Sequence, residues 1–316
     1  MSSRFGWGST LLGCTLLLQA CVAEVGATAP AAIEAESLVS LPPPPPLPTC
    51  PPRMEMVSGG CTPTPMFVGG VELWLRADRG VQTTRGGRVV RWGDQSGNAS
   101  HADVIVDGTG PVAITPSWLA PRHALRFART GEWSAATEDV GVLAVDLSAL
   151  AESADTTVMI VATRSDVLTN DAHTLVLGSG TGAAQCREAF AMGWTDVVWA
   201  TITNGCEATH AVAWPTGDPQ ILTGRVRSGF LGAGHQRSLL VDHAGTGAVG
   251  TSFAPFLDEG PIDGRIGRGF GGSADTRFEG DVHEIVVFDH ALEGDPDDAT
   301  TELGMATSWL RRHWSI

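Results

Sequence analysis

Three acidic residues near the C-terminal end of the chain have the types and the spacing that hydrolytic chemistry needs. Glu279, Asp281 and Glu284 lie within six consecutive positions. Two carboxyl groups about 5–5.5 Å apart can cleave a glycosidic bond with retention, one as the nucleophile and the other as acid and base. On a regular strand Glu279 and Asp281 point to one face and Glu284 to the other, so a β-bulge would be needed to bring them together.

A structural role explains the same residues, and we favour it. Glu284 shares its predicted face with Val282, Val286 and Phe288, and a carboxylate among apolar side chains is expected to be buried and hydrogen-bonded. The chain also lacks the G-x-S-x-G, H-E-x-x-H and P-loop motifs of other enzyme classes. We therefore predict no catalytic residue, and keep Glu279, Asp281 and Glu284 as the catalytic set of the alternative.

The segment around Asp94 could bind calcium. Asp94 and Asn98, together with Asp78 or Asp103, would supply the oxygen ligands that calcium prefers. A turn with Gly97 at positive φ requires the same residue types, and we favour the turn. Zinc is not predicted, because no cysteine pair has the C-x-x-C spacing and the histidines show no metal-ligand spacing.

Tryptophans in polar surroundings are candidates for stacking on sugar rings. Trp118, Trp133 and Trp214 lie in loop-like segments, and Trp199 lies in a predicted hairpin that turns at Gly193–Asp196. The other residues on the predicted face of Trp199 are small or Thr: Ala189, Ala191, Thr201 and Thr203. Such a face suits either a sugar or a second packed layer, and we favour the packed layer.

Four cysteines are left for disulfides once the two in the N-terminal segment are set aside. An even number is typical of an oxidising compartment, and the local pairings Cys50–Cys61 and Cys186–Cys206 are the simplest of those that the sequence allows. If Cys186 faces Cys206 across the hairpin, the intervening cross-strand neighbours are Phe190 with Ile202 and Met192 with Ala200.

The first 20 residues are predicted to direct export. Arg4 precedes an apolar run, Leu11–Leu18, that is too short to span a bilayer. Leu18-Gln19-Ala20-Cys21 then resembles the lipobox of bacterial lipoproteins, which implies a lipid on Cys21. No Asp follows Cys21 to retain the protein at the inner membrane, so the outer membrane of a Gram-negative bacterium is the expected location.

The segment 21–65 is predicted to be a tether, and 66–316 to be the folded domain. Proline recurs from Pro42 to Pro65, which favours an extended polyproline II spacer. Such a spacer would hold the domain away from the membrane.

Composition limits the class of protein further. The 316 residues are 43% apolar and 17% charged, with 39 Gly, which is typical of a turn-rich extracellular β protein. The net charge is -15 and all 20 basic residues are Arg. This acidity excludes a nucleic-acid binder that acts by neutralising phosphates, and it argues against a basic patch that binds anionic lipid.

Short apolar runs separated by Gly, Asp and Asn predict an all-β sandwich or barrel. The expected strands are Val71–Leu75, Val89–Trp92, Thr157–Val161, Thr174–Leu177, Ser238–Val241 and Val282–Phe288. The segment Thr157–Ala162 is apolar on both faces, which predicts a central strand with both sides covered. One helix is expected near the C-terminus, with Asp295 as N-cap, Pro296 at its first position and Ala299, Leu303, Ala306 and Leu310 at helical spacing.

Three stretches in order resemble the laminin G-like, concanavalin A-like domains of exported bacterial proteins. They are Leu73–Asp78 with Trp92–Asn98, then Ala124–Phe127, and finally Gly264–Arg268 with Phe278–Phe288. The last stretch also has the E-x-D-x-x-E spacing of retaining β-glucanases of this fold. The resemblance implies a jelly-roll sandwich of two antiparallel sheets, which often binds carbohydrate or protein and sometimes holds calcium.

Three hypotheses of function follow. The favoured one is a surface-tethered, lectin-like module that binds a glycan or a protein partner without catalysis. The alternatives are a retaining glycoside hydrolase on the same fold and a structural or adhesion lipoprotein without a small ligand.

Overall fold

The computed structural model describes a large part of the chain beyond the predicted tether. The described residues are 49–57, 59–115, 123–128, 140–148, 150, 155–164, 172–179, 188–194, 198–202, 210–212, 217–228, 235–241, 248–252, 262–268 and 278–316. All of them belong to one compact unit, Pro48–Ile316. No helix among them is long and apolar enough to cross a membrane.

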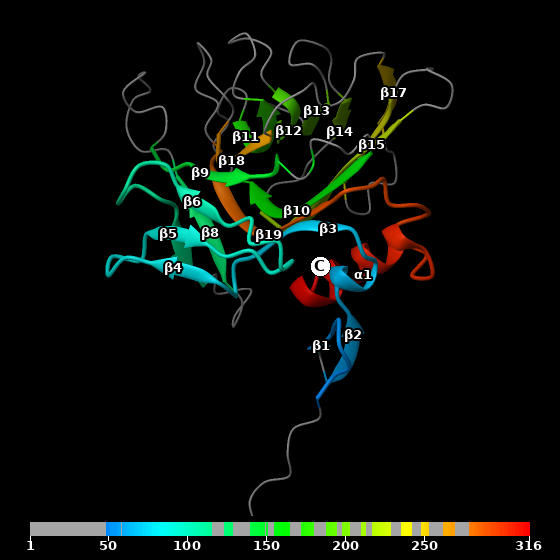
Figure 1. Ribbon diagram of the computed structural model, residues 1–316, viewed down its shortest axis with the longest axis horizontal. Coiled ribbons are helices and arrows are strands. Elements are labelled where there is room, and N and C mark those ends of the chain that lie inside the picture. The colour runs from blue at the N-terminus through cyan, green and yellow to red at the C-terminus, as the bar shows by residue number, and fades with distance from the viewer. Residues whose placement is uncertain are drawn as a thin grey trace, which may run out of the picture. The chain divides into compact units, whose positions relative to one another are not determined.

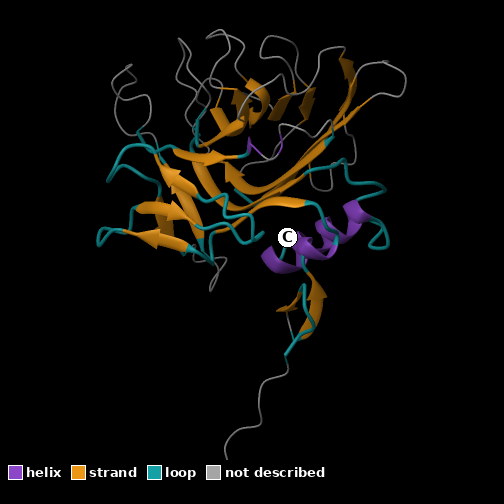
Figure 2. Ribbon diagram, in the orientation of Figure 1, coloured by secondary structure: helices purple, strands orange, loops and turns teal. Residues whose placement is uncertain are grey.

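Two antiparallel sheets form the body of this unit, and a single helix follows them among the described residues (Figures 1 and 2). Sheet I has the order β17 (Ala248–Ser252), β16 (His235–Val241), β15 (Gln220–Ser228), β10 (Thr156–Arg164), β19 (Gly280–Phe288), β8 (Ala124–Phe127) and β7 (Val112–Ile114), and β3 (Val71–Arg76) also pairs with β19. Sheet II has the order β14 (His210–Val212), β13 (Val198–Ile202), β12 (Glu188–Trp194), β11 (Ala172–Ser179), β18 (Ile262–Ile266), β9 (Leu143–Asp146), β6 (Ala102–Val104), β5 (Val89–Trp92) and β4 (Val81–Thr83). The predicted all-β sandwich of antiparallel sheets with a C-terminal helix is therefore confirmed.

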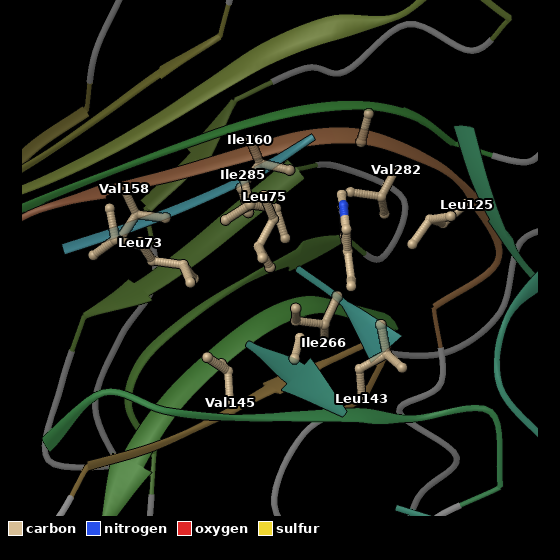
Figure 3. Packing of buried hydrophobic residues seen from close by; sticks show 14 of the residues in the cluster. Leu73, Leu75, Leu125, Leu143, Val145, Val158, Ile160, Ile266, Val282 and Ile285 are labelled. Atoms are coloured by element: carbon tan, nitrogen blue, oxygen red, sulfur yellow. The ribbon is translucent and has the colours of Figure 1, made fainter. Parts of the chain in front are cut away.

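The core lies between the inner faces of the two sheets. Leu73, Leu75 and Ile160 of sheet I have no exposed surface, and neither do Leu143 and Ile266 of sheet II. Figure 3 shows the side chains of the two layers pointing toward one another. Removing a Leu or Ile side chain of this size from water contributes about 1.5–3 kcal/mol, so this layer is the main source of stability of the sandwich.

The outer face of sheet I, which is turned away from sheet II, is covered by α1 (Glu302–Trp314). Leu303, Ala306 and Leu310 of the helix pack with Met159 and Val161 of β10. Strand β10 lies between β15 and β19 and is buried on both faces along nearly its whole length. The prediction that Thr157–Ala162 is a central strand with both sides covered is confirmed.

The helix begins later than predicted. Its N-cap is Thr301, whose side chain accepts from the backbone N–H of Gly304, whereas Asp295 was expected in that role. Asp295 and Asp298 instead accept the backbone N–H groups of Asp297 and Thr300 in Asx turns. These local hydrogen bonds compete with the helix, so residues 295–300 form a turn-rich loop.

An N-terminal hairpin packs on the helix. Strand β1 (Met54–Val57) pairs with β2 (Gly60–Pro63), and the short 3-10 helix η1 (Pro65–Phe67) follows. The disulfide Cys50–Cys61 closes the hairpin, as predicted, and Val57 joins the apolar cluster under α1. The folded part therefore includes residues from the C-terminal end of the predicted tether and begins before Met66.

Strands β12 and β13 pair in the predicted register. Phe190 is opposite Ile202 and Met192 is opposite Ala200. This is the register that a disulfide between Cys186 and Cys206 requires, although the two cysteines themselves lie outside the described residues.

Candidate functional site

The predicted catalytic carboxylates lie at the N-terminal end of β19, where the strand is bulged. Val161 of β10 pairs with Glu284, but the next residue, Ala162, pairs with Val282. His283 is thus an extra residue in the strand. The bulge that a shared face requires is present, and it places Asp281 and Glu284 together on the outer face of sheet I.

Because of this bulge, the predicted face of Val282 is wrong. Val282 lies in the core between the sheets with Ile285 and Val287, whereas Val286 and Phe288 lie under α1. Glu284 therefore shares its face with Val286 and Phe288, as expected, but not with Val282. Period-two alternation failed here because the bulge shifts the phase of the strand by one residue.

Glu284 is held by three tryptophan side chains. Its Oε1 accepts from Nε1 of Trp74 at 2.6 Å and from Nε1 of Trp309 at 3.3 Å, and its Oε2 accepts from Nε1 of Trp314 at 2.5 Å. The carboxylate has no exposed surface. Because the indole N–H can only donate, both carboxylate oxygens serve as acceptors within the protein, and neither is open to a substrate in this conformation.

Asp281 and Glu279 lie in surroundings that differ from those of Glu284. Asp281 accepts from Nε and from a terminal nitrogen of Arg126, each at 2.8 Å. Glu279 precedes the first residue of β19 and is half-buried. Asp281 is thus buried in an ion pair with the exposed Arg126, and Glu284 is buried among the tryptophans under α1. Retaining hydrolysis instead uses two carboxyl groups that are open to the substrate.

Arg76 lies against Trp74 and Trp309 and connects the N-terminal hairpin, the turn after β3 and α1. Its guanidinium binds Glu55 of the hairpin and Asp78, lies 3.1 Å from Nε2 of His313 on α1, and has only 1% of its side chain exposed. The group also lies over the rings of Trp74 and Trp309, at 5.3 and 5.6 Å from their centroids. Cation–π contact is strongest where water is excluded, as it is here.

Asp78, a predicted calcium ligand, belongs to this ion-pair cluster. Burial by itself would raise the pKa of its carboxyl, but hydrogen bonds with His313 and Arg76 outweigh burial and lower the pKa well below its usual range. Both carboxylate oxygens of Asp78 accept from Arg76. Arg76 and His313 therefore occupy the positions around Asp78 that a cation would need.

Asp94 and Asn98 form the predicted turn. Asp94 accepts from the backbone N–H groups of Trp74 and Ser96 at 2.9 Å and from the hydroxyl of Ser96 at 2.6 Å. Asn98 donates to the backbone oxygens of Val71 and Glu72, and Gly97 has φ of 101°. Within the described ranges no three His, Cys, Asp or Glu side chains are grouped to hold a metal ion. Asp78, Asp94 and Asn98 each have hydrogen-bond partners within the protein, and calcium binding by them stays a prediction.

The predicted tryptophan sites lie outside what the structure describes. Trp118, Trp133 and Trp214 are outside the described residues, as is Cys21. For Trp199 only the backbone is described, and it pairs with Gly193 across the hairpin. The sugar-stacking role of these four residues stays a prediction.

A hollow of about 470 Å³ lies on the outer face of sheet I, beside α1. Its lining consists of Ile221, Thr223, Leu240 and Val241 from the sheet, Gly294, Asp295, Pro296 and Asp297 from the loop, and Thr307 and Arg311 from the helix. This hollow was not predictable from the expected elements, because Asp295–Asp297 were expected to begin the helix. The Gly-Asp-Pro-Asp run is a turn signal that could have indicated a loop there.

Comparisons with known proteins show low similarity throughout. No family model and no curated protein matches the chain. Among solved structures, Trypanosoma rangeli sialidase with the inhibitor DANA is 16% identical over 82% of this chain and 35% of its own, with a TM-score of 0.49. Domain 4 of AbnA, a GH43 extracellular arabinanase from Geobacillus stearothermophilus, in complex with arabinotriose, is 14% identical over 75% of this chain and 98% of its own, with a TM-score of 0.45.

A third similar structure is the CBM40 of the Ruminococcus gnavus IT-sialidase bound to α2,3-sialyllactose. It is 18% identical over 56% of this chain and 95% of its own, with a TM-score of 0.40. The present chain spans 35% of the length of the first sialidase chain.

Proposed function

We propose that this chain is an exported, lipid-anchored binding module that recognises a glycan, or a protein partner, without catalysis. The observation that carries the proposal is the complete burial of Glu284 under Trp309 and Trp314. The only hydrolase-like spacing in the sequence is thereby accounted for by the packing of the helix on the sheet. What remains is a rigid β-sandwich, a scaffold on which loops and shallow hollows bind ligands.

Export is supported by cysteine chemistry. The disulfide Cys50–Cys61 is typical of an oxidising compartment. The lipobox-like residues Leu18–Cys21 supply the anchor in this proposal, and the proline-rich segment after them supplies the spacer. Metabolic labelling with a radioactive fatty acid tests the anchor: label is expected on the parent chain and should be absent from Cys21→Ala.

Ligand binding is tested with the full chain on a glycan array, with calcium and with a chelator. The array should include arabinotriose and α2,3-sialyllactose as well as neutral oligosaccharides. Saturable binding to at least one glycan is the expected result. Absence of binding to every glycan would favour the structural or adhesion lipoprotein instead.

The hydrolase alternative is tested by incubating the full chain with β-glucans and measuring reducing ends. No release above background is expected. Release that disappears in both Glu279→Gln and Glu284→Gln would contradict the binding-only proposal. Because Glu284→Gln alters the core, Glu279→Gln is the variant that separates loss of chemistry from loss of fold.

A further inference from the structure

We infer that the hollow beside α1 is the subsite that binds the neutral, hydroxyl-rich ring of a sugar. The inference rests on the proposed glycan-binding function and assigns its location and its ligand class. The volume of about 470 Å³ falls within the range of about 300–1,000 Å³ that small-molecule sites occupy.

An unpartnered hydroxyl lines the hollow. Thr307 has 3% of its surface exposed, and its Oγ1 has no hydrogen-bond partner among the described residues. Threonine in a helix often bonds to the carbonyl one turn earlier, but Thr307 does not. A buried hydroxyl without a partner is unfavourable, and a ligand hydroxyl in the hollow would satisfy it.

The charged groups favour a neutral polyhydroxylated ligand. A terminal nitrogen of Arg311 donates to Asp297 at 2.7 Å at the edge of the hollow, and Asp295 adds a second carboxylate. Carboxylates accept from sugar hydroxyls, and the guanidinium donates to them. Since the lining carries two carboxylates and one cation, it disfavours an acidic sugar such as sialic acid.

The remaining surface of the hollow is aliphatic. Ile221 and Val241 are almost fully buried, and Leu240 and Pro296 are half-buried. The C–H groups of a sugar ring can pack on such a floor while its hydroxyls face the polar side. A lining that combines apolar surface with convergent polar groups is typical of ligand sites.

The loop that forms one wall is held rigidly. The hydroxyl of Thr301 lies 3.0 Å from the backbone oxygen of Asp295 and 2.9 Å from that of Asp298. Gly294 has φ of 98°, and a Cβ there would collide with the side chain of Thr301. Gly304 likewise lacks a Cβ, which allows the backbone of Asp298 to lie against the helix. A wall fixed before binding loses little entropy when the ligand arrives.

The test is calorimetric titration of the full chain, purified in detergent, with the methyl glycosides of glucose, galactose, mannose and arabinose, and with α2,3-sialyllactose. At least one neutral glycoside is expected to bind more tightly than sialyllactose. Thr307→Val should weaken that binding at least tenfold, and Asp297→Asn at least threefold. The matched controls are Thr156→Val, which removes another buried hydroxyl without a described partner, and Asp107→Asn, an exposed acid outside the lining.

Thermal unfolding accompanies each titration. Thr307→Val is expected to be at least as stable as the parent, so that loss of binding reports on the site and not on the fold. Unchanged binding in Thr307→Val and Asp297→Asn, with loss in alanine variants of Trp118, Trp133, Trp199 or Trp214, would overturn the subsite while leaving the proposed function intact. Preference for sialyllactose would overturn the ligand class. A parent chain that binds no glycan, on the array or in titration, would overturn both.

Discussion

Trp314, in the last turn of the helix, donates its indole N–H to Oε2 of Glu284 at 2.5 Å. Trp74 from β3 and Trp309 from the helix donate to the other carboxylate oxygen. The carboxylate of Glu284 on β19 thus joins this strand to β3 and to the helix. It does so through indole N–H groups, which need an acceptor when they are buried. Glu284 has the sequence context of a catalytic acid, but its hydrogen bonds hold strands and helix together.

Glu284→Gln should destabilise the protein by about 2–3 kcal/mol. The amide can accept at one oxygen only, so its NH2 group would face an indole N–H with no acceptor between them, and hydrogen bonds to charged groups contribute about 1.5–3 kcal/mol. Denaturant unfolding followed by tryptophan fluorescence measures the effect. Glu279→Gln is the control and should change stability by less than about 0.5 kcal/mol; equal losses in the two variants would contradict the structural role of Glu284.

Arg76→Met should cost about 3 kcal/mol or more, far more than Arg126→Met. Removing one partner of a buried ion pair leaves the other charges without compensation, which typically costs about 3–5 kcal/mol. Arg76 is almost completely buried against Glu55 and Asp78, whereas Arg126 is 54% exposed in its pair with Asp281. Water screens the exposed guanidinium of Arg126, so this pair contributes less than a fully buried one; pairs exposed on both sides contribute about 0–1 kcal/mol. Similar losses of unfolding free energy in the two variants would contradict this account.

Stability should fall between pH 6.5 and pH 4 because of His283. Burial, opposed in part by the charge of Asp281, lowers the pKa of His283 to about 4, so the unfolded chain binds a proton in this window and the folded chain does not. The contribution of neutral His283 is complete above pH 6.5 and is lost as the pH falls toward 4, with a total of about 3 kcal/mol at about 1.4 kcal/mol for each pH unit.

The measurement is the free energy of unfolding at several pH values for the parent and for His283→Gln. The variant should show a flatter profile in the window from pH 6.5 to 4. Below this window both proteins should lose stability together. The pKa of the Asp78 carboxyl is lowered in the folded protein, so the unfolded chain binds a proton there before the folded chain does. Parallel profiles between pH 6.5 and 4 would show that another group carries the pH dependence.

Disulfide mapping should find Cys186 linked to Cys206 in addition to Cys50 linked to Cys61. The register of β12 and β13 is the one that this second bond needs. Trypsin cuts after Arg53 and after Arg187, between the cysteines of each pair. Non-reducing mass spectrometry should therefore detect Met54–Arg76 joined to the peptide that contains Cys50, and Ser165–Arg187 joined to Glu188–Arg225. A link from Cys50 or Cys61 to Cys186 or Cys206 would refute both pairings.

The sequence by itself was sufficient for the elements whose information is local. The short apolar run Val71–Leu75 and the two-sided apolar run Thr157–Ala162 predicted strands that the structure confirms, because such runs are formed by residues next to one another in sequence. The pairing of Phe190 with Ile202 was likewise predictable, since one turn determines the register of a hairpin.

The start of the helix and the phase of β19 were not predictable in this way. At Asp295 a helix N-cap and an Asx turn use the same side chain and differ little in local energy, so the contacts of Thr301 and Gly304 decide between them. The bulge at His283 arises from the pairing of β19 with β10. The residues of β10 that set this bulge are far from His283 in sequence, so no local pattern indicates it.

Which side chains meet in the candidate sites was decided by the tertiary structure. Trp74 reaches Glu284 across 210 positions of the chain, and Glu55 and His313 meet at Arg76 from opposite ends of the folded unit. The hollow beside α1 exists only where the loop, the helix and two strands come together. Residue types indicate which chemistry is available, but burial and hydrogen-bond partners decide whether a carboxylate serves a substrate or the core, and those are properties of the packed molecule.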